Sequence, residues 1–323
     1  MKLNQISFLS VFATLLVLTG HSDITLDFKE LWVYKWVYSF HMPLFFFVSG
    51  FLFAFTNPKE KMEELDSRKF LLKKVKRLLV PYIFISSIIF FIKGIMIPEE
   101  QMQNSVSFDF TAYSDMLMFH PIGFMWFLPA LFCVFIIFIS IKRYIYKPYI
   151  VLSGGALLFI ISLLDFNCSF FQIASAINYS VYFGLGILYC QNKMIVDENL
   201  KKYNIAILVI SFILSAMLIP IHTIAALTGI VFSIALSLML EKYCGHIIVT
   251  LSNYTYTIFL LSYFPQMFIR GPIAHKFGEV NQYILSATSF ISGFFIPVII
   301  AVFYNKYLKK YKLFNSLGVL IGL

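Results

Sequence analysis

Charged residues are scarce in this chain. Asp, Glu, Lys and Arg make up 13% of its 323 residues, about half of the roughly 25% usual in soluble domains. Apolar residues reach 60%, against roughly 45–50% in soluble proteins, and 19% of the chain is aromatic. Because a soluble fold of this length cannot bury so much apolar surface, the composition excludes a soluble enzyme and a disordered protein. The sequence predicts an integral membrane protein.

Cysteine motifs, internal repeats and low-complexity linkers are also missing. The four cysteines are scattered, with no CxxC pair and no metal-ligand spacing, so we predict no metal site. The first apolar run, residues 6–20, lacks an A-x-A cleavage site and leads into further spans, which favours an uncleaved helix over a signal peptide. We therefore predict a single transmembrane domain over residues 1–323.

Long uncharged runs recur along the sequence. A helix that crosses about 30 Å of hydrocarbon needs roughly 20 mostly apolar residues. The segments that meet this requirement are residues 4–21, 33–55, 78–97, 122–141, 149–165, 171–191, 204–220, 222–240, 247–268 and 282–305. The stretch 204–240 is divided because it is too long for one crossing and Pro220 supplies a turn. The predicted fold is an all-α bundle of about ten transmembrane helices.

The net charge of +9 is explained by membrane topology. With the N-terminus in the cytoplasm, ten spans place 20 of the 25 Lys and Arg residues on the inner side. Nine spans would leave the basic tail after residue 304 outside, against the positive-inside rule. We therefore predict that both termini are cytoplasmic and that the chain does not bind nucleic acid.

Two histidines lie near the predicted outer surface. His21 ends the first span, two residues before Asp23, and His41 lies roughly 12 Å inside the second span at about 1.5 Å per residue. Neutral histidine can take a proton from a hydroxyl and return it near pH 7, and one cavity can hold both imidazoles. Alternatively, His21 caps its helix and His41 makes a packing hydrogen bond. The other four histidines are expected on the surface.

A basic segment and a tryptophan supply further candidates. The inner loop contains Lys73, Lys76 and Arg77, and the planar guanidinium of Arg77 suits a phosphate group best. Such clusters also fix orientation or contact anionic lipid, and that alternative stays open. Trp126 opens the fourth span, where it is either an interfacial belt residue or a substrate-binding residue.

Taken together and in this order, these segments resemble the membrane acyltransferase-3 family, in particular its fucose 4-O-acetylase-like sugar O-acetyltransferases. The resemblance covers most of the chain. It rests on His21 and on segments 40–45 (FHMPLF), 49–52 (SGFL), 76–82 (KRLLVPY) and 126–131 (WFLPAL). The sequence departs from the family pattern at Ser10, where many members carry an arginine linked to acyl-CoA handling, and at Ser262, where many carry a histidine. Arg77 or Arg68 can take the place of that arginine.

The resemblance implies an O-acyltransferase of the bacterial cytoplasmic membrane. Such an enzyme moves an acetyl or related acyl group from cytoplasmic acyl-CoA, commonly acetyl-CoA, to a hydroxyl of a cell-surface polysaccharide or lipid-linked sugar. The resemblance implies that His21 is catalytic. We expect Asp23 to orient His21, His41 to assist it, and the basic segment 73–77 to hold the phosphates of the donor.

The expected partners are acyl-CoA, a carbohydrate acceptor and the lipid bilayer, while the oligomeric state is left open. The alternative function is export of a polysaccharide or lipid-linked sugar without acyl transfer. Transporters often contain paired, interrupted helices in two halves and charged residues at mid-membrane depth. Neither feature is clear in this sequence.

Overall fold

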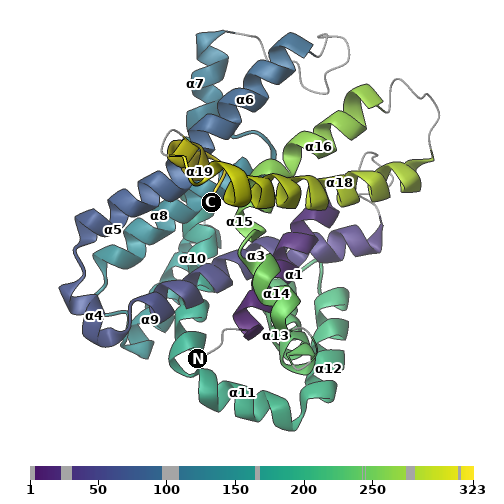
Figure 1. Cartoon of the computed structure of the whole chain (residues 1–323). Helices are drawn as coiled ribbons and strands as arrows, with labels where there is room; N and C mark the ends of the chain where they lie inside the picture. The colour runs from purple at the N-terminus through teal and green to yellow at the C-terminus, as the bar shows by residue number, and fades with distance from the viewer. Residues whose placement is uncertain are drawn as a thin grey trace. The chain divides into compact units, whose positions relative to one another are not determined.

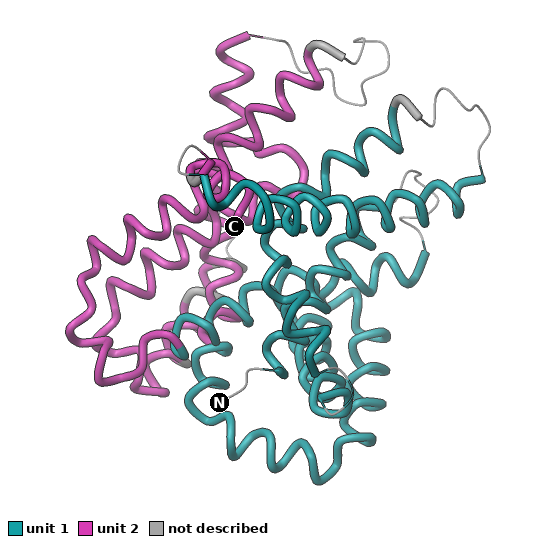
Figure 2. Tube along the Cα trace, in the orientation of Figure 1, with its two compact units in different colours: residues 1–55, 185–312, 323 teal, residues 56–184, 313–322 magenta. Residues whose placement is uncertain are grey.

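The computed structural model describes residues 4–22, 31–96, 109–163, 168–241, 243, 245–273, 281–311 and 314–323. These residues form helices and no strand, which confirms the predicted all-α class. The chain divides into two compact units, coloured separately in Figure 2. Unit 1 contains residues 1–55, 185–312 and 323, and unit 2 contains residues 56–184 and 313–322. That the whole chain acts as one domain stays a prediction.

Unit 1 is built around the first two apolar segments and the second half of the chain (Figure 1). Its elements are α1 (Asn4–His21), α3 (Trp32–Thr56, except its last residue), the end of α10 (Ile173–Gln191), α11 (Lys193–Lys202), α12 (Asn204–Met217), α13 (His222–Leu240), α14 (Gly245–Ser252), α15 (Thr255–Leu261), α16 (Tyr263–Phe268), η5 (Ile269–Ile273), α18 (Gln282–Phe303) and η6 (Tyr304–Leu308). Helix α1 contacts α13, α14, α15 and α18, so it is packed on several sides.

Aromatic packing fixes α3 within unit 1. The Trp36 indole donates a hydrogen bond of 2.8 Å to Ser215 on α12, which satisfies the polar edge of a large apolar ring. Phe40 lies so close to Gly229 of α13 that a Cβ there would come within 2.4 Å of the Phe40 ring. The glycine thus lets α13 approach α3 at the level of His41, the next residue along α3.

Unit 2 contains the basic segment and the helices that follow it. Its elements are α4 (Lys59–Glu64), α5 (Ser67–Lys74), η1 (Val75–Leu79), α6 (Val80–Met96), α7 (Phe110–Met118), η3 (Gly123–Trp126), α8 (Phe127–Ser140), α9 (Pro148–Leu163), η4 (Phe170–Gln172), the first part of α10 and α19 (Asn315–Leu320). Helix α8 packs on α5 and η1, while α6 contacts α7 and α19. This packing holds the basic segment against an apolar helix.

The predicted spans all coincide with helices of the described chain. Among the described residues, seven helices are long and apolar enough to cross a membrane. The number rises to as many as nine if each of two pairs, bent by 93° and 49°, counts as one span. The bent pairs are α11 with α12 and α14 with the helix after it. The remaining predicted span, 149–165, coincides with the shorter apolar helix α9. The stretch 204–240 divides between Met217 and His222, as Pro220 predicted.

The basic loop before the third predicted span is itself helical. Helices α5, η1 and α6 form one continuous helical run from Ser67 to Gly94, so the helix begins 11 residues before the predicted start at residue 78. Asp66 caps its first turn, because its carboxylate accepts a hydrogen bond of 3.1 Å from the backbone N–H of Lys69. That hydrogen bond holds the pKa of the Asp66 carboxyl below its usual value. Asp66 thus stabilises the start of the helix that carries the basic residues.

Candidate functional site

His21 is the last residue of α1 and is half-buried within unit 1. Its imidazole lies edge-on to the ring of Tyr38 on α3, with centroids 6.3 Å apart. The Tyr38 hydroxyl donates a hydrogen bond of 3.1 Å to the Gly20 carbonyl, and a Cβ on Gly20 would come within 2.7 Å of the Tyr38 ring. Because residue 20 is a glycine, the Tyr38 ring can pack directly on the last turn of α1. This contact fixes the end of α1 against α3.

His41 lies on the buried side of α3, and only 3% of its surface is exposed. Its Nδ1–H donates a hydrogen bond of 2.9 Å to the Val37 carbonyl, one helical turn earlier. Because the carbonyl can only accept, this bond makes Nε2 the nitrogen of the neutral imidazole that can accept a proton. The packing hydrogen bond considered from the sequence thus exists, and it leaves the second ring nitrogen available for chemistry.

Tyr38 brings the two histidines together. Its ring lies 4.8 Å from the His41 ring and 6.3 Å from the His21 ring, centroid to centroid. His21 also interacts electrostatically with His41 and with Arg270 of η5. The two predicted imidazoles therefore form one cluster in unit 1. Asp23, the predicted orienting carboxylate, lies outside the described residues.

Arg270 is a functional candidate that sequence reasoning did not identify. It belongs to a π-helical segment, and its Nε–H donates a hydrogen bond of 3.1 Å to the Gln266 carbonyl. In the sequence Arg270 is one of five basic residues predicted on the outer side, and nothing in its spacing links it to His21. Its association with His21 depends on the packing of residues about 250 positions apart, which no local pattern encodes.

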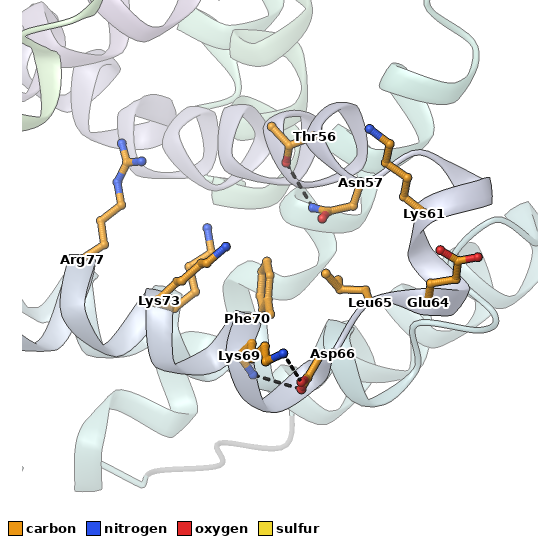
Figure 3. Close-up of a pocket in the computed structure, with 11 residues that line it drawn as sticks. Thr56, Asn57, Lys61, Glu64, Leu65, Asp66, Lys69, Phe70, Lys73 and Arg77 are labelled. Atoms are coloured by element: carbon orange, nitrogen blue, oxygen red, sulfur yellow. Dashed lines mark hydrogen bonds and ion pairs between the residues drawn. The ribbon is translucent and has the colours of Figure 1, made fainter.

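The basic segment of unit 2 lines a pocket of about 590 Å³ (Figure 3), which lies within the usual range of roughly 300–1,000 Å³ for small-molecule sites. Five cationic and two acidic side chains line it: Lys61, Lys69, Lys73, Lys74, Arg77, Glu64 and Asp66. Lys73 and Arg77 are exposed, and Figure 3 shows both on the same helical run facing Thr56 and Asn57. The excess of positive charge suits an anionic ligand.

Helix packing separates the predicted phosphate-binding residues into two groups. Lys73 and Arg77 line the pocket, whereas Lys76 and Arg68 are exposed elsewhere on the same helical run. Lys74, which was not a predicted donor residue, places its ammonium 3.8 Å from the centre of the Phe135 ring on α8. This cation–π contact holds the wall of the pocket in place. A donor-binding role for Lys76 stays a prediction.

Trp126 ends η3, directly before α8, and is half-buried. Its ring packs on that of Tyr179 in α10, with centroids 5.4 Å apart. Trp126 thus packs against another helix of unit 2, and both the belt role and the substrate-binding role stay predictions. Among the other histidines, His120, His222 and His246 are exposed, as expected, and His275 lies outside the described residues.

Unit 1 therefore holds two imidazoles, a phenol and a guanidinium together, and unit 2 holds a cationic pocket. Within the described residues no three His, Cys, Asp or Glu side chains are grouped so that they could hold a metal ion. Imidazole is the side chain best suited to proton exchange with a hydroxyl near neutral pH, and an excess of cationic side chains suits phosphate groups. That the chain uses either group in this way stays a prediction.

A family model described as an acyltransferase domain matches residues 4–306, which includes nearly the whole chain and both clusters. No curated protein and no solved structure matches the chain.

Proposed function

Since the chain belongs to the acyltransferase-3 family and is therefore a membrane acyltransferase, we propose that it transfers an acetyl or related acyl group from cytoplasmic acyl-CoA to a hydroxyl of a cell-surface polysaccharide or lipid-linked sugar. We further propose that it resides in a bacterial cytoplasmic membrane with both termini inside. The observation that carries the proposal is the His21–Tyr38–His41 cluster at the end of α1, within the matched residues.

The proposed reaction begins at His21. A ring nitrogen of His21 takes the proton of the acceptor hydroxyl while the hydroxyl oxygen attacks the thioester carbonyl carbon. The carbon–sulfur bond then breaks, and the CoA thiolate leaves and is reprotonated by the imidazolium. His41 assists through Nε2, because its Nδ1–H is held by Val37. General-base assistance contributes about 10²–10⁴-fold, and positioning of the two substrates supplies much of the remainder.

The donor is proposed to bind in the pocket of unit 2. Arg77 and Lys73 line that pocket and hold phosphate groups of the donor, and Arg77 can form two parallel hydrogen bonds with one phosphate. Many relatives carry an arginine at the position of Ser10. Ser10 has no positive charge, and its hydroxyl donates a hydrogen bond of 2.9 Å to the Ile6 carbonyl of its own helix, so it does not take the role of that arginine. Arg77 is favoured over Arg68, which lies outside the pocket lining.

Arg77→Gln is expected to raise the KM for acetyl-CoA about tenfold, the effect of about 1.4 kcal/mol of lost phosphate binding, with little change in kcat. The measurement is transfer of radiolabelled acetyl groups to endogenous acceptors in inverted membrane vesicles. Arg68→Gln is the matched control, because it removes the same charge from the same helical run outside the pocket. Equal KM values for the two variants would place the donor elsewhere.

A deletion strain tests the overall proposal. The surface glycan of the deletion strain should lose its acyl esters while the amount of exported glycan stays the same, and the wild-type gene should restore the esters. Loss of export with normal esterification of the glycan that remains in the cell would instead identify the chain as an exporter.

A further inference from the structure

Gln266 is fully buried on α16 and contacts both α1 and α18, although it carries a polar carboxamide. Its Nε2 donates a hydrogen bond of 3.3 Å to the Leu18 carbonyl, three residues before His21. On the other side lies Gly293 of α18, where a Cβ would come within 2.9 Å of the same nitrogen. The glycine therefore makes room for the carboxamide, which ties α16 to the last turn of α1.

The carboxamide is not fully satisfied. Its Oε1 has no hydrogen-bond partner among the described residues. A buried polar atom without a partner costs free energy, so packing alone does not favour glutamine here. Its one side-chain hydrogen bond instead fixes how the helix that carries Arg270 lies against the helix that carries His21.

Arg270 follows one turn after Gln266. The segment Ile269–Ile273 is π-helical, a rare local conformation that is frequent at functional sites. The Arg270 Nε–H is held by the backbone carbonyl of Gln266, and its positive charge interacts electrostatically with His21. The guanidinium is thus oriented from α16 and lies near the proposed base.

We infer that Arg270, whose Nε–H is held by the Gln266 carbonyl, stabilises the negative charge that develops on the thioester carbonyl oxygen. This inference rests on the proposed function. As the hydroxyl oxygen bonds to the carbonyl carbon and its proton moves to His21, the carbonyl π electrons move to oxygen, beside the guanidinium. When the carbonyl re-forms, the carbon–sulfur bond breaks, the thiolate leaves with its electron pair, and the imidazolium returns the proton to it.

A cation beside a base is useful only if negative charge forms nearby. The Arg270 guanidinium repels a positive charge on His21. In this step, however, an oxyanion forms together with the imidazolium, and the guanidinium attracts the oxyanion. Fixed charges that face the developing charge in a partly water-excluded site are among the largest contributions to catalysis. Arg270 of η5 is held by the Gln266 carbonyl of α16 and therefore needs little reorganisation when the charge appears.

The test is label transfer from radiolabelled acetyl-CoA to endogenous acceptors in inverted vesicles that contain the full-length protein. Arg270→Gln is expected to lower kcat about 10²-fold while the KM for acetyl-CoA stays within about twofold. Arg270→Lys, which keeps a positive charge, is expected to recover at least about a tenth of the wild-type rate. Lys35→Gln, which removes an exposed cation from α3 in the same unit, should leave kcat unchanged.

Several results would overturn the inference. Wild-type kcat in Arg270→Gln would exclude a catalytic charge at this position, and a raised KM with normal kcat would show that Arg270 only binds a substrate. If Arg270→Lys loses as much rate as Arg270→Gln and both melt at a lower temperature, the role is structural. No label transfer by the wild-type protein would contradict the proposed function itself, whereas normal wild-type transfer with an unaffected Arg270→Gln would contradict the inference alone.

Discussion

Replacement of His21 by alanine is expected to lower acyl transfer by about 10²–10⁴-fold, the usual contribution of a general base. The substitution removes the only imidazole at the end of α1 and leaves His41 deeper in α3, where its Nδ1–H is bound to Val37. His41 cannot take over without a change in the position of the acceptor. We therefore expect His41→Ala to lose less activity than His21→Ala.

The loss in His21→Ala should appear without loss of folding. His21 is half-buried and ends its helix, while the contact between Tyr38 and Gly20 does not involve the imidazole. The melting temperature in detergent should therefore stay near that of the wild type. The measurement is kcat for label transfer from acetyl-CoA, normalised to the amount of inserted protein.

His222→Ala is the matched control for this substitution. His222 belongs to the same unit and begins α13, but it is exposed and makes no part of the cluster. It should keep the wild-type rate. A His21→Ala protein that is inserted, stable and fully active would refute the proposed mechanism, whatever the result for the donor pocket.

Much of the fold could be predicted because a lipid environment favours a helix wherever the local sequence is apolar. Every backbone polar group in hydrocarbon must be paired within its own helix, so an uncharged run of sufficient length predicts a helix from the sequence alone. The break near Pro220 was predicted for the same local reason. The early start of the helix at Ser67 was not, because charged residues suggested a loop, whereas Lys and Arg are good helix formers and Asp66 caps the turn.

The candidate site could be predicted only where its residues share a local motif. His21 and His41 lie on neighbouring apolar segments, and the basic segment is continuous in sequence, so each was visible from spacing. Arg270 and Gln266 join the cluster through contacts with residues about 250 positions earlier. Gly293 matters only because of the side chain that it faces on another helix. Such long-range contacts leave no periodic signal in a single sequence.

Gly186→Ala is the substitution with the largest expected effect on stability, at about 1–3 kcal/mol or more. A Cβ at Gly186 of α10 would come within 2.0 Å of the Phe47 carbonyl oxygen on α3 and 2.8 Å of the Phe51 nitrogen. Both are backbone atoms and cannot rotate away, so the two helices must separate by about 1 Å to reach 3.0 Å. The measurement is the melting temperature of the detergent-purified protein.

Separation of the helices also disturbs a buried network next to Gly186. Tyr189 packs on Phe47 and Phe51, accepts a hydrogen bond of 2.7 Å from Gln5 and donates one of 2.6 Å to Asp197. A carboxylate that loses this partner inside unit 1 adds to the cost of the overpacking itself. The loss should therefore exceed that of an ordinary glycine-to-alanine change in a helix.

Gly154→Ala on α9 provides the control. A Cβ at that position meets no atom within 4 Å, and alanine favours a helix by about 1 kcal/mol over glycine, so the variant should be as stable as the wild type or more stable. Equal melting temperatures for both variants would mean that α3 and α10 are not in contact at Gly186. Because His41 and Phe47 share α3, Gly186→Ala should lose activity together with stability, whereas His21→Ala should lose activity alone. That difference separates damage to the scaffold of unit 1 from removal of the proposed base.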